Sequence, residues 1–295
     1  MIQFTIIVIG IELIEAVFQL LNRFDGVVSE SQIRHALGLG SRQEIKELNQ
    51  LLSADKRFIN CEENKWKCAP LATLIEDKPL REVTFIITDI ETTGSIRGKD
   101  RIIEIAALKV NNGDILDSFE YLINPHKIIS RQISKLTKIT NSTIQDSPSI
   151  EEVLPEYIDF VDNGVFVAHN SLFDFCFINS EIRRLGINSL KNQADICTYR
   201  IAKKLLPKVK ARGISGLSMY FDYPLRDRHR AMPDVKATHF FLHRFLQELE
   251  KQNINSLHQL IDFQTDKLGK NELRKKLKKQ KKKKNYYSRF NKHFS

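Results

Sequence analysis

The first 72 residues show apolar positions at helical spacing, followed by two short stretches typical of strands. The first predicted helix carries an apolar stripe made by Ile14, Val17, Phe18 and Leu21. A second helix is expected to start at Ser29 or Ser31 and to end before Gly38. Ser41–Glu44 forms a capping-box pattern that opens a third helix. Two strands, Arg57–Glu62 and Trp66–Ala69, are expected on either side of a polar turn.

This order of three helices and a hairpin is typical of a winged helix-turn-helix, so residues 1–72 are predicted to form a small winged-helix-like domain. One interpretation is DNA binding through the third helix. The other is a docking or structural module, because residues 1–72 carry eight Lys/Arg against nine Asp/Glu and the third helix itself carries Glu44 and Glu47. Both interpretations stay open.

Beyond a linker predicted at residues 73–82, the pattern changes to that of a larger domain over residues 83–250. Three apolar strands are expected at about 83–89, 101–110 and 114–123. Asn112-Gly113 favours a tight hairpin between the second strand and the third. Because no helix separates these strands, antiparallel pairing is expected.

The second half of this domain alternates helices and strands. Ser149–Glu152 is a capping box that opens a helix. Val165–Ala168 is a short apolar run typical of a buried parallel strand. A helix from about Leu172 to Leu185, a strand near 190–195 and further helices to about 250 follow. The pattern therefore predicts an α/β fold with a mixed sheet flanked by helices.

Four carboxylates and one histidine stand at the ends of these elements. Asp89 and Glu91 end the first strand and run into a Thr-Thr-Gly turn. Asp174 closes the string Ala-His-Asn-Ser-Leu-Phe-Asp after the parallel strand, and His229 precedes Asp234 by five residues. Since residues i and i+2 of a strand share one face, Asp89 and Glu91 can aim at the same ligand.

These residue types suit a pair of divalent cations and a general base. Mg²⁺ prefers oxygen ligands in octahedral geometry, and two such ions about 3.5–4 Å apart can clamp the attacking and leaving oxygens of a phosphoryl displacement. A neutral imidazole at His229 can accept a proton from the attacking water. Each motif alone is explained equally well by a solvated strand end, a helix cap or chance. Their joint occurrence in this order indicates a metal-dependent phosphodiester hydrolase.

The three segments resemble the exonuclease motifs of the DEDDh family, the DnaQ-like 3′→5′ exonucleases, over about residues 83–250. That family includes the epsilon proofreading subunit of bacterial DNA polymerase III, the exonuclease domain of the Gram-positive replicative polymerase, and RNase T. Ile133–Thr140 is similar to the family segment I-S-x-L-T-G-I-T, with Lys138 in place of the usual Gly. This change is expected to alter contact near the substrate strand. The tyrosine branch of the superfamily has its Tyr at the position of Arg230, so the histidine branch is the match.

The resemblance implies a ribonuclease H-like exonuclease domain, a mixed five-stranded sheet flanked by helices. It implies that two Mg²⁺ or Mn²⁺ ions would be held by Asp89, Glu91, Asp174 and Asp234, with His229 as the general base. The 3′-terminal nucleotide would be lined by Thr92, Thr93 and Gly94. Asn170 and Phe173 would support the second motif, although a plain core aromatic explains Phe173 equally well.

The implied function is a metal-dependent 3′→5′ exonuclease that hydrolyses DNA from single-stranded or frayed 3′ ends and releases nucleoside 5′-monophosphates, in proofreading or repair. One alternative is an RNA 3′-end-processing exonuclease, since RNase T belongs to the same family. A second alternative is a non-catalytic nucleic-acid-binding protein with the exonuclease fold. Its signature would be a missing carboxylate, and all four are present.

The net charge of +10 is concentrated at one end of the chain. After a helical segment predicted at 251–267, residues 268–295 form a Lys-rich tail that is expected to be disordered. Residues 270–295 hold twelve Lys/Arg and one Glu, and the remainder has 34 basic against 35 acidic residues. The tail is either a solubilising end or a tether for phosphate groups. The tether is favoured because the remainder lacks basic charge of its own. Three aromatic residues of the tail can stack on bases: Tyr286, Tyr287 and Phe290.

Two further features bear on location and partners. The four cysteines have no CxxC spacing, which argues against zinc and indicates reduced thiols in a cytoplasmic protein. The apolar start, Met1–Ile11, lacks a preceding Lys or Arg and is followed by Glu12 and Glu15, so neither a signal peptide nor a membrane span is expected. Gln259–Phe263 is similar to sliding-clamp-binding pentapeptides, although an amphipathic helix turn explains it as well. A DNA polymerase and its clamp are therefore candidate partners.

Overall fold

The computed structural model describes residues 17, 27–37, 42–55, 57–62, 64–69, 75–187 and 195–265. The chain divides into two compact units, Met1–Glu76 and Asp77–Ser295. The division falls inside the linker predicted at residues 73–82. The Lys-rich tail predicted at 268–295 lies outside the described residues, as does Ser41 of the predicted third-helix cap. Each unit is described by itself.

The N-terminal unit contains two helices and a small antiparallel sheet in its described part. These elements are β1 (Val28–Ser29), α2 (Glu30–Leu37), α3 (Arg42–Ala54), β2 (Phe58–Glu62) and β3 (Lys65–Cys68). The strand order is β1-β3-β2, and β1 was not predicted because it is only two residues long. Of the predicted first helix only Val17 is described, as a buried helical residue. The winged-helix interpretation of this unit therefore stays a prediction.

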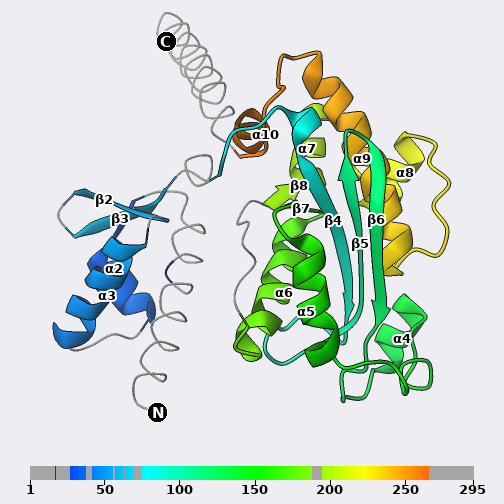
Figure 1. Cartoon of the computed structure of the whole chain (residues 1–295), viewed down its shortest axis with the longest axis horizontal. Helices are drawn as coiled ribbons and strands as arrows, with labels where there is room; N and C mark the ends of the chain where they lie inside the picture. Colours follow the sequence, from blue (N-terminus) through cyan, green and yellow to red (C-terminus); the bar gives the residue numbers. More distant parts are fainter. Residues whose placement is uncertain are drawn as a thin grey trace, which may run out of the picture. The chain divides into compact units, whose positions relative to one another are not determined.

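The second unit carries a five-stranded sheet with helices on both faces (Figure 1). Its elements are η2 (Leu80–Glu82), β4 (Thr84–Thr92), β5 (Ile102–Asn111), β6 (Asp114–Leu122), α4 (Arg131–Thr137), α5 (Ile150–Val161), β7 (Val165–Ala168), α6 (Ser171–Arg184), β8 (Asp195–Cys197), α7 (Thr198–Leu205), α8 (Ile214–Tyr220), α9 (Ala231–Glu250) and α10 (Leu257–Gln264). The helix α4 was not predicted, nor was the short helix η2, which lies in the predicted linker; the other elements follow the predicted order.

The sheet order is β6-β5-β4-β7-β8, with β4, β5 and β6 antiparallel and with β7 and β8 parallel to β4. This is the mixed five-stranded sheet that the sequence predicts. The hairpin between β5 and β6 turns at Asn112 (φ 49°) and Gly113 (φ 91°). Positive φ at both central residues defines the type I′ turn, which is why Asn-Gly suits it.

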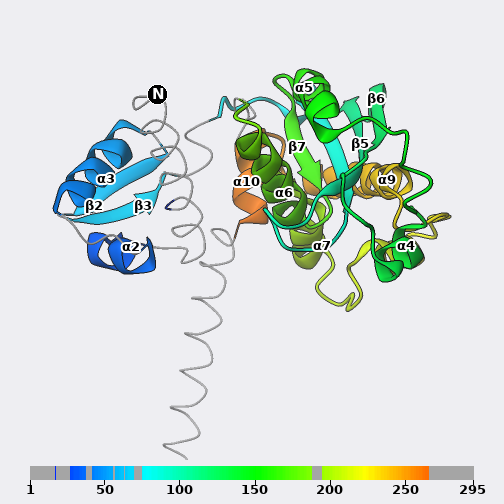
Figure 2. The ribbon, with the colours of Figure 1, turned by 90° about the horizontal axis from the view of Figure 1, so that it is seen from below.

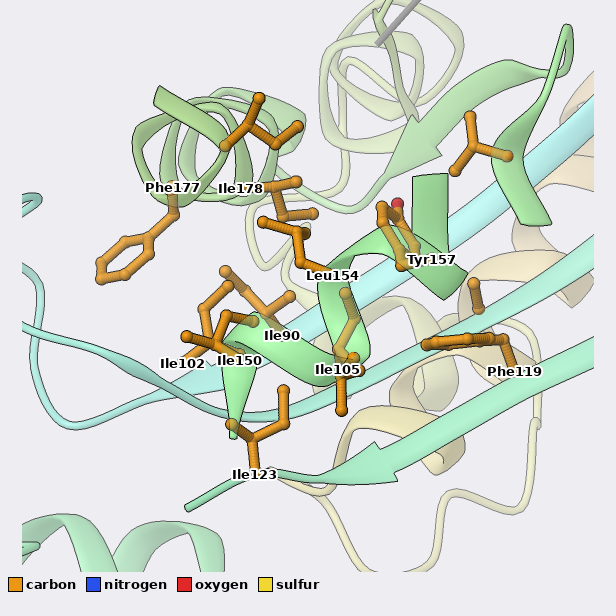
Figure 3. Packing of buried hydrophobic residues seen from close by; sticks show 14 of the residues in the cluster. Ile90, Ile102, Ile105, Phe119, Ile123, Ile150, Leu154, Tyr157, Phe177 and Ile178 are labelled. Atoms are coloured by element: carbon orange, nitrogen blue, oxygen red, sulfur yellow. The ribbon is translucent and has the colours of Figure 1, made fainter. Parts of the chain in front are cut away.

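One face of the sheet is covered by α5 and α6, and the opposite face by α9 (Figure 2). The core between the sheet and helices α5 and α6 is apolar and includes the buried side chain of Ile86. Figure 3 shows Ile90, Leu154, Tyr157 and Phe177 of the same core. Side chains alternate along a strand. The residues of β4 that alternate with Ile86 and Ile90 therefore face α9. The carboxylates of Asp89 and Glu91 are therefore on the α9 side of the sheet.

The C-terminal segment predicted at 251–267 packs into this unit through α10. Leu260 and Ile261 are 0% and 1% exposed. The side chain of Gln264 accepts a hydrogen bond from the backbone N–H of Cys197 at 2.7 Å and donates one to the carbonyl of Asp195 at 2.6 Å. Leu260 and Ile261 of the Gln259–Phe263 string are thus part of a core, whereas Phe263 is only partly buried. The string lies within helix α10, as the amphipathic-helix explanation expects, and clamp binding stays a prediction.

In the part of the chain that the structure describes, no helix is both long and apolar enough to cross a lipid bilayer.

Candidate active site

The C-terminal end of β4 forms the floor of the candidate site. Asp89 and Glu91 both face α9, and Glu91 lies opposite Glu104 in the antiparallel register with β5. On the other side of β4, pairing with β7 reaches only from Phe85 to Ile87. The last residues of β4 therefore extend past β7, which leaves backbone N–H groups on that edge without a strand partner.

Asp174 fills this gap from the first turn of α6. Its Oδ1 accepts a hydrogen bond from the backbone N–H of Ile90 at 3.3 Å, and its side chain is 4% exposed. The helix starts there because Asn170 takes a left-handed conformation (φ 69°, ψ 48°) at the N-cap. Among non-glycine residues Asn adopts this conformation most readily. The amide of Asn170 forms no cap hydrogen bond, so its backbone rather than its side chain turns the chain into α6.

His229 and Asp234 approach the same floor from the start of α9. His229 also has a left-handed backbone (φ 64°) and lies just before the helix, whose first turn contains Asp234. The backbone N–H of His229 donates to Oδ2 of Asp234 at 3.4 Å. One ligand atom each of Glu91, His229 and Asp234 lies within 4.8 Å of the other two. The spacing is that of groups able to share one cation.

The pKa values show how much negative charge is gathered here. Burial, followed by the charges of Asp174 and Glu91, raises the pKa of Asp89 well above its ordinary value. Burial raises the pKa of Asp174 in the same way. Burial and the charge of Asp234 raise the pKa of Glu91 to about 8, and burial raises that of Asp234 to about 6. Without cations, these carboxylates are held in a place that disfavours their ionised form.

His229 experiences the opposite effect. Partial burial, with a smaller contribution from the neighbouring Arg228 charge, lowers its pKa below the ordinary value. Its imidazole is therefore mainly neutral at pH 7 and able to accept a proton.

One further observation indicates that these residues can hold divalent cations. Oδ1 of Asp234 is buried and has no hydrogen-bond partner among the described residues. A buried carboxylate oxygen without a partner is costly unless a cation or water satisfies it. Hard oxygen donors with one imidazole match the ligands that Mg²⁺ and Mn²⁺ accept.

The Thr-Thr-Gly turn after β4 is held by its own hydrogen bonds. Oγ1 of Thr92 donates to the carbonyl of Gly94 at 2.6 Å. Oγ1 of Thr93 donates to Oδ1 of Asp100 at 3.3 Å and accepts from the backbone N–H of Arg101 at 3.0 Å. A Cβ on Gly94 would lie 2.5 Å from Oδ2 of Asp100. Glycine is therefore needed because Asp100 packs over it, a reason that the sequence did not reveal.

Phe173 lies at the edge of the apolar core beneath α6. It is partly buried, packs against the core cluster, and its ring centroid lies 5.6 Å from that of Phe177. This placement agrees with the interpretation of a core aromatic, while a role beside the substrate stays a prediction.

Sequence reasoning missed two residues next to the carboxylates. Glu104 is 0% exposed and binds Arg230, whose Nη2 lies 2.7 Å from its Oε1. Arg228 lies with its Nε 3.7 Å from Oδ2 of Asp234. The signal for Glu104 was a single charged residue inside the apolar run Ile102-Ile103-Glu104-Ile105. A buried charge of this kind needs a partner.

Comparison with known sequences places the second unit of the chain in a wider family. A family model described as an exonuclease, that of the RNase T family, matches residues 86–239, just over half of the chain. Similar curated proteins include the PolC-type DNA polymerase III of Staphylococcus epidermidis, 36% identical over 187 residues, and that of Staphylococcus aureus, 36% identical over 185 residues. Each match covers 63% of this chain and 13% of the polymerase, so the chain spans a small part of the length of these relatives.

Solved structures with a similar fold include two nucleases. Escherichia coli Exonuclease I in complex with a dT13 oligonucleotide has a TM-score of 0.53 at 15% identity, over 58% of this chain and 42% of that one. The nuclease domain of 3′hExo, a DEDDh family member bound to rAMP, has a TM-score of 0.50 at 18% identity, over 58% of this chain and 95% of that one. At these identities the likeness is one of fold, and it confirms the predicted ribonuclease H-like architecture.

Proposed function

Since the chain belongs to the RNase T family of exonucleases, we propose that it removes nucleotides one at a time from the 3′ end of DNA. The products are nucleoside 5′-monophosphates, and the reaction needs divalent cations. The observation that carries this proposal is the cluster of Glu91, His229 and Asp234, with ligand atoms within 4.8 Å of one another. Asp89 and Asp174 add their charge to it.

The four carboxylates, Asp89, Glu91, Asp174 and Asp234, would hold two Mg²⁺ or Mn²⁺ ions. When bound, these ions supply charge stabilisation for the attacking and leaving oxygens of an in-line displacement. His229 accepts a proton from the attacking water, for which its lowered pKa keeps the imidazole neutral at pH 7. Thr92, Thr93 and Gly94 line the terminal nucleotide, at a turn whose shape is held by Asp100.

A nucleic-acid substrate agrees with a basic stretch of the chain that starts next to the second motif. Between Asp195 and Asp222 the chain has six Lys/Arg and no Asp or Glu. Arg200, Lys204 and Arg212 bind backbone or side-chain oxygens of the same unit. The exposed basic side chains in this stretch are those of Lys203, Lys208 and Lys210. The stretch starts next to the second motif. Oγ1 of Thr198 lies 2.9 Å from Nδ1 of His169, and His169 directly precedes Asn170. Lysines at this edge attract phosphate groups.

The test uses DNA oligonucleotides labelled at either end. With Mg²⁺, a 5′ label is expected to give a ladder that shortens step by step, and a 3′ label to give mononucleotide at once. Glu91→Gln should lose about 10²–10³-fold in rate, the order that removal of one preorganised electrostatic group from a catalytic site produces. The matched control is Glu120→Gln, an exposed carboxylate on β6. Release of label from the 5′ end, or full turnover in EDTA, would contradict the proposal.

We propose DNA as the substrate because the similar curated proteins are DNA polymerases by name. Proofreading or repair further requires a preference for unpaired 3′ ends. A primer–template with a mismatched 3′ end should therefore be digested faster than the matched one, and an RNA primer of the same sequence should be digested more slowly. Faster digestion of RNA would assign the chain to RNA 3′-end processing instead.

A further inference from the structure

The backbone around His229 is held in an uncommon shape. Asp227 and His229 both have positive φ, 49° and 64°. Such a conformation is uncommon for a non-glycine residue and persists where the surroundings impose it. The residues next to His229 make contacts that can hold this shape.

Two arginines on either side of His229 are fixed to different elements. Nη1 of Arg228 donates to Oγ of Ser215, on α8, at 2.7 Å. Nε and Nη2 of Arg230 donate to Oε1 of Glu104, on β5, at 3.0 Å and 2.7 Å. Of these two anchors, the second is the more deeply buried, because the side chain of Glu104 is 0% exposed and that of Arg230 is 32% exposed.

Glu104 also fixes the first residue of α9. Its Oε2 accepts a hydrogen bond from the backbone N–H of Ala231 at 2.9 Å. The first N–H groups of a helix have no partner within the helix, and a carboxylate there is favoured by the helix dipole. One buried carboxylate thus holds both the arginine that follows His229 and the start of the helix that carries Asp234.

The position of Glu104 links this anchor to the strand carboxylates. Glu104 is the register partner of Glu91, so the two residues lie side by side on the same face of the sheet. Both oxygens of Glu104 are already used by Arg230 and Ala231, which leaves Glu91 to meet His229 and Asp234.

We propose that the Glu104–Arg230 pair positions His229 and Asp234 against Glu91, and that its loss lowers turnover without removing any group that touches the substrate. Glu104 and Arg230 are then positioning residues for the proposed exonuclease reaction. The kinetic part of the proposal rests on that proposed function. The structural part, the position of His229, is tested in the metal-free protein.

The experiment compares Glu104→Gln, Arg230→Lys, Arg230→Met and the double variant Glu104→Gln/Arg230→Met with the wild type. Glutamine keeps the shape of Glu104 but offers one acceptor oxygen instead of two, and lysine keeps the charge of Arg230 without the paired N–H groups. The control is Arg184→Met. Arg184 also binds a buried glutamate, Glu181, at 2.8 Å, but in the last turn of α6. All rates are taken at a temperature where each variant is folded by circular dichroism.

We expect Arg230→Met to lower kcat about 10²-fold, the effect of a misplacement of about 1 Å in a catalytic group, with a change in KM for DNA below about threefold. Arg230→Lys should recover part of kcat. The double variant should be no worse than the poorer single variant, because residues that act through one contact are not additive. Arg184→Met should keep kcat even where its melting temperature falls as far.

The structural readout is the imidazole NMR signal of His229 in the metal-free protein, assigned with His229→Gln. It should shift in Arg230→Met and Glu104→Gln and stay in place in Arg184→Met. An unchanged signal in both pair variants, or an equal loss of kcat in the control, would overturn the proposal. If the wild type does not hydrolyse DNA, the proposed function fails, whereas the NMR comparison still decides whether the pair positions His229.

Discussion

Oδ1 of Asp174 accepts a hydrogen bond from the backbone N–H of Ile90, 3.3 Å away. The bond exists because β7 pairs with β4 only as far as Ile87, and the first turn of α6 takes over where the strand ends. The carboxylate of Asp174 thereby has two tasks, as an acceptor for a buried N–H group and as a charge next to Asp89.

These two tasks can be separated by substitution. Asp174→Asn keeps an acceptor for Ile90 and removes the charge, whereas Asp174→Ala removes both. Both variants should lose hydrolysis. The free energy of unfolding of the alanine variant should be about 1–3 kcal/mol lower than that of the asparagine variant, because a buried N–H group is left unsatisfied. Urea unfolding in EDTA measures the difference. Equal stabilities would show that Ile90 does not depend on this carboxylate.

The raised carboxylate pKa values make the stability of the metal-free protein depend on pH. Glu91 has a folded pKa of about 8 against an ordinary 4.5, and Asp234 about 6 against 3.8. Between the ordinary pKa and the folded pKa of each group, the folded state binds more protons than the unfolded state. The free energy of unfolding should therefore fall as pH rises from about 5 to about 8. Urea unfolding in EDTA at several pH values tests this.

Cations should reverse the trend at high pH. Mg²⁺ or Mn²⁺ binds the ionised cluster in the folded state, so its stabilising effect should be larger at pH 8 than at pH 5. Asp234→Asn should flatten the dependence on pH in EDTA and weaken the effect of Mn²⁺. A pH dependence that stays unchanged in Asp234→Asn would mean that other groups cause it.

His229 should control the acidic limb of the pH–rate profile. Its pKa is lowered by burial and by Arg228, so kcat/KM should fall only below the ordinary histidine pKa of about 6.5. His229→Gln should cost about 10²–10⁴-fold in kcat, the usual contribution of a general base, and should leave Mn²⁺ binding measurable. A mutant profile with the same acidic limb would assign that limb to another group.

Gly94 should not tolerate a side chain, because of Asp100. The Cβ of Gly94→Ala would lie 2.5 Å from Oδ2 of Asp100, which also binds the backbone N–H of Ile96 at 2.9 Å. Moving Asp100 breaks these bonds, so we expect a loss of about 1–3 kcal/mol in stability together with a loss of activity. Gly213→Ala is the control, since a Cβ there meets nothing within 4 Å. Thermal unfolding and oligonucleotide digestion of both variants test the difference.

Lys138 offers a test of backbone strain. It occupies the C-cap of α4 with φ 62°, and its Nζ binds Oδ1 of Asp227 at 2.8 Å, although both side chains are more than half exposed. Relief of the left-handed strain is worth about 1 kcal/mol, whereas an exposed ion pair contributes about 0–1 kcal/mol. Lys138→Gly should therefore leave stability equal or higher, and Lys138→Ala should lower it. A stability loss in the glycine variant as large as that in the alanine variant would show that the ion pair outweighs the strain.

The sequence by itself determined the order of the elements in the second unit. Periodicity and caps predicted β4, β5, β6, α5, β7 and α6 because each signal is local: Asn112-Gly113 for the turn, Ser149–Glu152 for the cap, and apolar Val165–Ala168 for the buried strand. The resemblance of three short motifs to one exonuclease family was confirmed by the family model. It could be seen in the sequence because each motif is a short run of neighbouring residues.

Contacts between distant residues were decided only by the tertiary structure. Asp174 meets Ile90 across 84 positions, and Arg230 meets Glu104 across 126. No local pattern specifies such a pair. A buried charge needs a partner, but which residue lies next to it is set only when the chain has folded. For the same reason Leu260 and Ile261, which resembled part of a docking peptide, became core residues once α10 packed against the sheet. Local sequence sets the elements, whereas the surroundings of a buried polar group exist only in three dimensions.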